Sequence, residues 1–232
     1  MQEKSAVVIV AAGSSHRMVV YDKLWIPLAG RITLARTIDV FDTSPLIENI
    51  VLVVNTQHFS DTRDLCEREE WRKILTIVEG GPRRQDSVRA GLDALAEFAP
   101  WTHWVMIHDG ARPLVSHQLL TAGLEAARQY QAAVAVVPLK DTVKQIEERW
   151  VSTTIDRSHL RAVQTPQVFS FPLIYDAHTG EFASEDVTDD ATLLELSGYR
   201  VALFPGSYTN IKITTPEDVF IAEALLRGSF MS

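Results

Sequence analysis

The chain has 232 residues, of which 46% are hydrophobic and 22% are charged, so it can form one large folded domain with a substantial core. Its 22 Lys and Arg residues against 30 Asp and Glu residues give a formal net charge of −8 at pH 7. This charge argues against a protein that coats nucleic acid or an anionic membrane. An anionic ligand would bind only where Lys and Arg residues gather locally.

Several features predict a cytoplasmic protein. Cys66 is the single cysteine, which excludes an intrachain disulfide and does not indicate secretion. The first predicted strand begins after four residues, without the apolar block of a signal peptide. No apolar stretch approaches the roughly 20 residues that span a bilayer. We therefore expect neither a membrane partner nor a nucleic-acid partner.

Short apolar runs alternate with amphipathic segments along most of the chain. The runs rich in β-branched residues predict strands at residues 5–10, 50–54, 74–78, 104–107, 132–137 and 199–204. Apolar residues at helical spacing predict helices at residues 33–41, 57–72, 85–98, 116–130, 188–196 and 216–226. This alternation predicts an α/β fold: a Rossmann-like, mostly parallel sheet flanked by helices.

The alternation is interrupted between residues 138 and 166. Residues 143–146 and 150–155 resemble two strands around a charged turn, which predicts a β-hairpin. We expect residues 1–232 to form a single domain, with this hairpin protruding as an arm at about residues 139–157. The arm is either a surface excursion of the sheet or an element that reaches a second subunit, and we favour the second interpretation.

The loop after the first strand has the composition of a phosphate-binding loop. Ligands of open α/β sheets bind beyond the carboxyl ends of the strands. Small residues there let a phosphate approach the backbone N–H groups. The loop lacks the spacing of a dinucleotide fingerprint and of a P-loop. Arg17 and Lys23 could neutralise a triphosphate; alternatively, both are ordinary surface charges.

Two later strand ends carry further candidate residues. Gly81 and Ser87 follow the third strand, where a flat base could pack against the backbone; the alternative is a turn and a helix cap. Asp109, Gly110 and Arg112 follow the fourth strand. The carboxylate could hold a metal ion or a sugar hydroxyl, and the arginine a phosphate. A structural ion pair is the alternative.

Taken together, these motifs lie in an order that resembles one enzyme family. The matching residues are Ala11-Ala12-Gly13, Arg17-Met18, Lys23, Gly80-Gly81, Asp86-Ser87-Val88, His108-Asp109, Ala111-Arg112-Pro113, Asp156-Arg157, Gln164-Thr165-Pro166-Gln167, Thr188-Asp189 and Asn210-Ile211-Lys212. The chain resembles 2-C-methyl-D-erythritol 4-phosphate cytidylyltransferases, of the non-mevalonate isoprenoid pathway, nearly end to end. The resemblance implies that CTP and methylerythritol phosphate give 4-diphosphocytidyl-2-C-methyl-D-erythritol and pyrophosphate. It also implies Mg²⁺ as cofactor and a homodimer formed through the hairpin arm.

The resemblance further implies a role for each site residue. The catalytic residues would be Arg17, Lys23 and Lys212, which are expected to converge on the phosphorus under attack. The nucleotide would be bound by Ala11, Ala12, Gly13, Ser14, Gly81, Ser87, Asp109 and Gly110. The phosphorylated polyol would be bound by Asp109, Arg112, Thr142, Arg157 and Thr188, some of them from the partner subunit. Mg²⁺ would be held through the triphosphate, with Asp109 as a candidate ligand.

The sequence departs from the family pattern at three places. Ser14 and Ser15 stand where relatives often have a second glycine. The segment from Met18 to Lys23 is one residue shorter than usual and lacks the proline often found before the lysine. Pro82 stands where an acidic residue is common, and because proline has no N–H, a base contact from that amide is absent.

Three alternative functions make different demands. A ribitol-5-phosphate cytidylyltransferase would share the CTP half and differ in the acceptor pocket. A nicotinamide-dependent oxidoreductase would need a full glycine fingerprint and an acidic residue closing the second strand, which instead ends Val54-Asn55-Thr56. A non-catalytic sugar-nucleotide binding module would need fewer cations around the phosphates.

Overall fold

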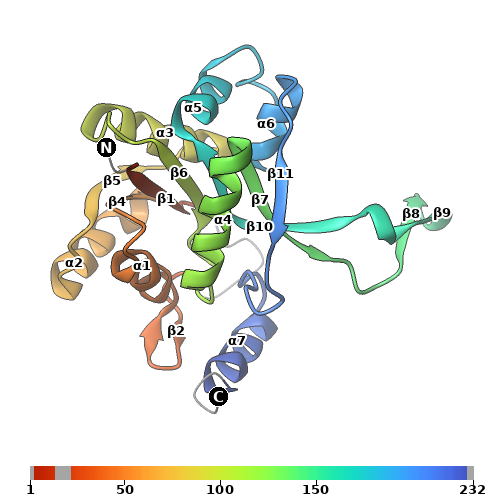
Figure 1. The fold of residues 1–232 in the computed structure, drawn as a ribbon. Coiled ribbons are helices and arrows are strands. Elements are labelled where there is room, and N and C mark those ends of the chain that lie inside the picture. Colours follow the sequence, from red (N-terminus) through yellow and green to blue (C-terminus); the bar gives the residue numbers. More distant parts are fainter. Residues whose placement is uncertain (1–2, 14–21, 229–232) are drawn as a thin grey trace.

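A seven-stranded sheet organises the molecule, with helices on both of its faces (Figure 1). The computed structural model describes residues 3–13 and 22–228, so the predicted site residues Ser14 and Arg17 lie outside the described residues. The strand order is β11-β7-β10-β6-β1-β4-β5. The bounds are β1 (Ser5–Ala11), β4 (Asn49–Val54), β5 (Ile74–Glu79), β6 (Trp104–Asp109), β7 (Ala132–Pro138), β10 (Arg161–Ser170) and β11 (Ala202–Pro205).

Strand pairing is parallel except at β10, which runs antiparallel to both β6 and β7. β1 lies between β4 and β6, and its residues Ala6 to Ile9 are fully buried. A strand covered on both faces needs apolar side chains at every position, which explains the continuous apolar run in the sequence. The predicted α/β fold with a mostly parallel sheet is confirmed.

The helices divide between the two faces of the sheet. Their bounds are α1 (Thr33–Thr43), α2 (Phe59–Glu69), α3 (Arg84–Phe98), α4 (His117–Tyr130), α5 (Phe171–Thr179), α6 (Asp190–Leu196) and α7 (Pro216–Gly228), with short 3₁₀ turns η1 (Thr56–His58) and η2 (Arg157–His159). Val7 and Ile9 pack in one core layer with α1 and α4. Ala6 and Val8 pack in the other, with α3, α5 and α6. This division follows from the two-residue period of a strand.

The sequence analysis missed β10 and α5. The hairpin is the only element predicted between residues 138 and 166, and Gln164-Thr165-Pro166-Gln167 gives no strand signal because a polar stretch with a proline argues against a central strand. The structure accommodates the stretch with a shift of register against β7 between Val163 and Gln167. The strand therefore stays within the sheet while its polar side chains serve the site described below. The strand predicted at 199–204 begins later, at Ala202.

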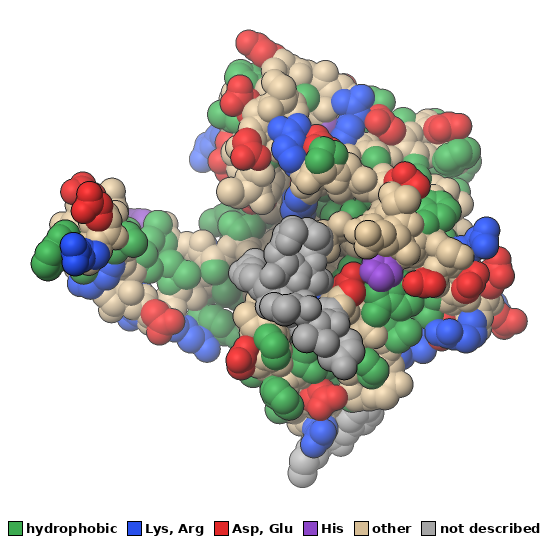
Figure 2. All heavy atoms as spheres, turned by 180° about the vertical axis from the view of Figure 1, so that it is seen from behind, with side chains coloured by type: hydrophobic (Ala, Val, Ile, Leu, Met, Phe, Trp, Pro, Cys, Tyr) green, Lys and Arg blue, Asp and Glu red, His purple; other side chains and the backbone are tan. Residues whose placement is uncertain are grey.

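The predicted hairpin consists of β8 (Val143–Glu147) and β9 (Trp150–Ile155), which form a separate two-stranded sheet. It extends away from the main sheet (Figure 1). Ile146, Trp150 and Val151 are 66%, 69% and 60% exposed, and Figure 2 shows hydrophobic side chains along the projecting arm. The arm thus presents large apolar side chains that the described part of this chain leaves uncovered.

A second small hairpin, β2 (Pro27–Leu28) with β3 (Arg31–Ile32), lies beside α7. Leu28, Ile213 and Ala222 form a minor core between them. Within residues 3–13 and 22–228, no helix is both long enough and apolar enough to cross a membrane.

Candidate active site

The site forms where the loops after β1, β5 and β6 meet at one edge of the sheet. The parallel register sets Val10 of β1 beside Asp109 of β6, so the loops that follow these strands are neighbours. They enclose a cavity with part of the chain after β11. The described lining residues are Val10, Ala11, Ala12, Gly13, Lys23, Leu24, Gly81, Pro82, Arg83, Arg84, Ser87, Asp109, Ala111 and Lys212. This is the carboxyl edge at which open α/β sheets bind ligands.

The paired glycines after β5 are required by close packing. A Cβ on Gly80 would lie 2.2 Å from the Cβ of Ala12, and one on Gly81 would lie 2.4 Å from the Cβ of Asp86. The loops after β1 and β5 therefore touch through backbone, which brings the predicted phosphate-binding and base-binding segments together. The Ser87 hydroxyl is buried and donates to the carbonyl oxygens of Gly81 (3.4 Å) and Arg83 (3.2 Å), so it holds this loop in shape.

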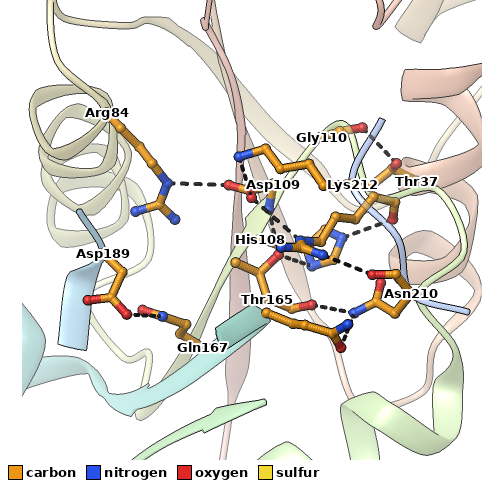
Figure 3. Close-up of polar contacts among 12 residues, drawn as sticks. Thr37, Arg84, His108, Asp109, Gly110, Thr165, Gln167, Asp189, Asn210 and Lys212 are labelled. Atoms are coloured by element: carbon orange, nitrogen blue, oxygen red, sulfur yellow. Dashed lines mark hydrogen bonds and ion pairs between the residues drawn. The ribbon is translucent and has the colours of Figure 1, made fainter. Parts of the chain in front are cut away.

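Asp109 lies at the centre of the charged groups, as Figure 3 shows. Its Oδ2 is 2.9 Å from Nζ of Lys212, and its Oδ1 is 3.3 Å from Nε of Arg84. Nε of Arg112 lies 3.6 Å from Oδ2. Burial would raise the pKa of Asp109, but the charges of Arg84, Lys212 and Arg112 outweigh it and hold the pKa well below its usual value. The carboxyl group is therefore ionised and fixes the positions of three cations.

A buried chain of hydrogen bonds holds the turn that carries Asp109. The Asp109 N–H donates to Thr165 Oγ1 (3.0 Å), and Thr165 Oγ1 lies 3.1 Å from Nδ1 of His108. The Arg112 carbonyl can only accept, so Nε2–H of His108 donates to it at 3.2 Å, and Nδ1 of the neutral ring accepts from the Thr165 hydroxyl. Burial lowers the pKa of His108 to about 3, which keeps the ring neutral. One side chain thus spans both ends of the turn.

Asn210 ties Lys212 to the same turn. The buried side-chain amide of Asn210 donates to the Thr165 carbonyl (2.8 Å), and the backbone carbonyl of Asn210 accepts from Nη1 of Arg112 (2.9 Å). The Ile213 N–H donates to the Ala111 carbonyl at 2.8 Å. Lys212 therefore lies on a segment without regular secondary structure that is fixed on either side. Two of the three cations predicted to converge, Lys23 and Lys212, line one cavity, and Arg17 lies outside the described residues.

A second cavity adjoins the first. Its described lining residues are Arg84, Asp109, Arg112, Val163, Gln164, Thr165, Gln167, Thr188, Asp189 and Lys212. Arg84, Asp109 and Lys212 line both cavities, so these three side chains mark where the cavities meet. Asp189 caps α6 by accepting from the Thr192 N–H (3.1 Å), and its other oxygen accepts from Nε2 of Gln167 (2.9 Å). Two ligands placed in the two cavities would touch at the shared residues.

The predicted acceptor-binding residues fall into two groups. Arg112 and Thr188 line the second cavity. Thr142 and Arg157 are exposed at the base of the arm and are not among the described residues that line either cavity. Arg157 donates to the carbonyl of Lys140, also in the arm. Within one chain, the structure therefore brings the first two residues to the site and not the last two.

Sequence reasoning did not single out Arg84, although it contacts both sides of the site. Its Nη1 lies 2.7 Å from Oδ2 of the fully buried Asp190, while its Nε faces Asp109. Burial would lower the pKa of Arg84, but Asp190 and Asp109 outweigh it and raise the pKa. The available signal was its position as the first helical residue after the paired glycines at a strand end. The sequence analysis also did not predict that Gln164, Thr165 and His108 hold the site together. Most of their hydrogen-bond partners lie far away in the sequence.

The described residues do not form a metal site by themselves. Within them, no group of three or more His, Cys, Asp or Glu side chains could hold a metal ion. Among the described residues, Asp109 is the only carboxylate that lines both cavities, and Asp189 lines the second cavity alone. Mg²⁺ is commonly bound by one or two carboxylates together with substrate phosphates. The residues therefore fit a metal ion that arrives with a triphosphate and gains Asp109 as a protein ligand.

A small-residue loop at a strand end, adjoining cavities and cations gathered where they meet are the features of an α/β nucleotidyltransferase. The model of the IspD family, 2-C-methyl-D-erythritol 4-phosphate cytidylyltransferase, matches residues 5–228. The chain belongs to this family. The resemblance stated from the motifs is confirmed, and membership excludes the oxidoreductase alternative.

Curated relatives and solved structures agree with this assignment. The chain is 46% identical over 228 residues to the 2-C-methyl-D-erythritol 4-phosphate cytidylyltransferase of Dehalococcoides mccartyi, covering 98% of each chain. It is 44% identical to the enzyme of the same name from Halalkalibacterium halodurans, covering 95% of this chain and 96% of that one. The 4-diphosphocytidyl-2C-methyl-D-erythritol synthase structure from Anaerococcus prevotii superposes with a TM-score of 0.84 at 34% identity, covering 97% and 96% of the two chains.

Proposed function

We propose that this chain transfers the cytidylyl group of CTP to 2-C-methyl-D-erythritol 4-phosphate, giving 4-diphosphocytidyl-2-C-methyl-D-erythritol and pyrophosphate. The observation that carries the proposal is that two cavities meet at Arg84, Asp109 and Lys212. The first cavity is enclosed by the small-residue loop and the glycine pair, and suits the nucleotide. The second has Arg112 and Thr188 in its wall and suits the phosphorylated polyol.

The reaction needs charge stabilisation more than proton transfer. A phosphate oxygen of the acceptor attacks the α-phosphorus of CTP, and the bond from that phosphorus to the bridging oxygen breaks as pyrophosphate leaves. A phosphate monoester has its second pKa near 6, so the nucleophile is already anionic at pH 7. The obstacle is repulsion between two anions and the added charge on five-coordinate phosphorus. Fixed cations reduce both.

Asp109 positions these cations before a substrate binds. Its ionised carboxylate holds Lys212 and Arg84 where the cavities meet, so the positive groups need little rearrangement when charge develops. Lys23, on the wall of the first cavity, would add a cation beside the triphosphate. Asp109 and the triphosphate oxygens would hold Mg²⁺, which when bound supplies Lewis-acid neutralisation of the phosphate charge. Arg17, outside the described residues, keeps its predicted role at the phosphorus.

The loop between β5 and α3 is the candidate for base selection. Pro82 is exposed on the cavity wall and has no N–H to offer a cytosine. Selection would then depend on the remaining backbone groups near Gly81, whose carbonyl is held by Ser87. We propose that CTP is preferred through these groups.

We further propose that the acceptor cavity is completed by the arm of a second copy. The exposed Ile146, Trp150 and Val151 supply an apolar surface suited to a partner chain. Thr142 and Arg157 would reach the partner's acceptor cavity from there. A cytoplasmic location is part of this proposal, supported by a fold that uses no disulfide.

A pyrophosphate-release assay tests the proposed function. Each of the four nucleoside triphosphates is supplied with methylerythritol phosphate or with ribitol 5-phosphate, and the product mass is measured. We expect pyrophosphate only from CTP with methylerythritol phosphate, and only with Mg²⁺ present. Turnover with ribitol 5-phosphate alone would assign the chain to the alternative cytidylyltransferase activity. Sedimentation of the same preparation tests the dimer.

A further inference from the structure

The start of α3 is joined to a distant loop by side chains that no motif predicted. The loop comprises residues 183–190, which we call the acceptor segment because it carries Thr188 and Asp189 into the second cavity. It precedes and begins α6. The residues Arg83, Arg84 and Gln85 follow the glycine pair of the first cavity and Pro82, and each of them contacts this segment. The two cavity walls are therefore parts of one connected unit.

Gln85 makes the most extensive contacts with the acceptor segment. Its Nε2 donates to the carbonyl oxygens of Ala183 (3.1 Å) and Glu185 (2.6 Å), and its Oε1 accepts from the Val187 N–H (3.1 Å). The side chain is 4% exposed and is not among the described residues that line either cavity. Every polar atom of the side chain is therefore engaged with the segment, while the residue lies behind the cavity walls.

Arg84 forms the second connection, next to the cavities. It joins Asp109 to Asp190, the first residue of α6, with Nη1 to Oδ2 of Asp190 at 2.7 Å. Asp190 Oδ1 in turn lies 3.3 Å from Nε2 of the buried His178. Arg83 adds a bond to the Ser184 carbonyl at 3.1 Å. A lysine in place of Arg84 has one ammonium group and no planar fork, so it could not engage both carboxylates in this geometry.

We propose that Gln85 and Arg84 are positioning residues that set Thr188 and Asp189 at a fixed distance from the nucleotide cavity. The proposal rests on the proposed function and deepens it. Gln85 acts entirely through the acceptor segment, whereas Arg84 also contributes charge where the cavities meet. Loosening this connection would shift the acceptor relative to the α-phosphorus. A misplacement of about 1 Å can cost roughly 100-fold in rate.

The test compares Gln85→Met and Arg84→Lys with Arg89→Lys as the control. Arg89 is also on α3, pairs with Asp93 and donates to the His178 carbonyl at 2.7 Å, but it is not among the described cavity-lining residues. We expect both test variants to raise the acceptor KM and lower kcat, with kcat/KM for the acceptor falling about 10- to 100-fold. For Gln85→Met, the dissociation constant for CTP, measured by calorimetry without acceptor, should change less than about threefold, which is well under 1.4 kcal/mol. Arg84 lines the nucleotide cavity itself, so CTP binding is compared for Gln85→Met alone. Arg89→Lys should match the parent chain in every parameter.

Several outcomes would overturn the proposal. A parallel loss of CTP binding in Gln85→Met, or the same loss in Arg89→Lys, would indicate general destabilisation of α3. If kcat/KM for the acceptor falls in Arg84→Lys but not in Gln85→Met, Arg84 acts only through its charge at the site. The proposed positioning role would then be refuted. If Gln85→Met does not fold, as judged by thermal unfolding and CTP binding, Gln85→Asn replaces it, because its amide adds no charge but is one methylene too short to keep all three hydrogen bonds.

Hydrogen exchange at the Val187 amide separates this proposal from the proposed function. Faster exchange in Gln85→Met than in the parent chain is expected whatever the substrates are. If the parent chain is inactive but the Val187 amide exchanges faster in Gln85→Met, the proposed function is refuted and the connection through Gln85 is supported. An active parent chain with unchanged exchange and kinetics would refute the connection alone.

Discussion

The carboxyl edge of the sheet and the arm both carry predicted acceptor-binding residues, but they are held in very different ways. At the sheet edge, Asp109 is 7% exposed and contacts three cations, and hydrogen bonds fix the backbone on both sides. In the arm, Thr142 and Arg157 are exposed on a two-stranded hairpin that stands apart from the main sheet. The first region is built by one chain. The second presents exposed side chains that the described part of this chain does not cover.

The physical reason lies in what each region can bury. A charged group at the sheet edge is stabilised because the parallel register brings its counter-charges from β6, α3 and the chain after β11 to one place. An isolated two-stranded hairpin is marginally stable in water and gains little from its own side chains. Exposed Ile146 and Trp150 would gain most from contact with another chain. Mutations in the two regions should therefore differ in kind.

The largest effect is expected at the sheet edge. Lys212→Ala removes the ammonium group that lies 2.9 Å from Asp109 and that, in the proposed reaction, would face the phosphorus under attack. Loss of one such donor costs about 10²- to 10³-fold in kcat, and CTP binding should weaken far less. Lys23→Ala should behave similarly. Lys4→Ala, which removes an exposed pair with Glu48, is the control. A change confined to KM in both test variants would show that these lysines bind the ground state only.

The arm should respond through assembly. Trp150→Glu places a charge on the exposed apolar surface, so we expect dissociation of the dimer and a fall of about tenfold or more in kcat/KM for the acceptor, or at least 1.4 kcal/mol. The secondary structure measured by circular dichroism should be unchanged. Phe220→Glu, at a residue on α7 that is 73% exposed, controls for the charge itself. Sedimentation equilibrium and acceptor kinetics measure the result; a monomeric parent chain, or a fully active monomeric variant, would contradict the proposed role of the arm.

A substitution in the core between α3 and the sheet should have a smaller effect, on stability alone. A Cβ on Gly91 of α3 would lie 2.4 Å from Cγ1 of Val8 and 3.0 Å from Cγ2 of Val53. Gly91→Ala should therefore lower the free energy of unfolding by about 1–3 kcal/mol through overpacking. Chemical denaturation measures this. Gly228→Ala, where a Cβ meets nothing within 4 Å, is the control, and equal stability of the two variants would contradict the packing argument.

A pH dependence of stability is also expected, set by His108. Burial lowers its folded-state pKa to about 3 from an ordinary 6.5, so between these values the unfolded chain binds a proton that the folded chain excludes. Stability contributed by the neutral ring is therefore fully present above pH 6.5 and is lost as the pH falls toward 3, with a slope of up to about 1.4 kcal/mol per pH unit. His108→Gln should flatten the dependence between pH 6.5 and 4. Asp109, whose pKa is lowered, loses its contribution only below its ordinary value of 3.8, outside this window. Equal slopes in the two proteins would refute the assignment.

Local patterns in the sequence sufficed for most of the fold. Apolar runs such as residues 5–10 and 104–107 predicted buried strands because a strand covered on both faces excludes polar side chains. The hairpin was predicted from its two short strands and charged turn. β10 was missed because its polar residues face partners that lie far away in sequence, including Ser207 and Asn210 around Gln164. A polar stretch can be buried when such partners satisfy its hydrogen bonds, and the local sequence does not show where those partners are.

The sequence by itself determined the fold class, the family and the short motifs that supply cations and small residues at strand ends, because these depend on residue type and spacing. Only the tertiary structure decided that Lys23 and Lys212 line one cavity, that Asp109 gathers Arg84, Arg112 and Lys212, and that Gln85 holds the acceptor segment. Some of these contacts join residues that lie a hundred or more positions apart in the sequence. Strand order and register decide which of them meet, and no local pattern encodes that order.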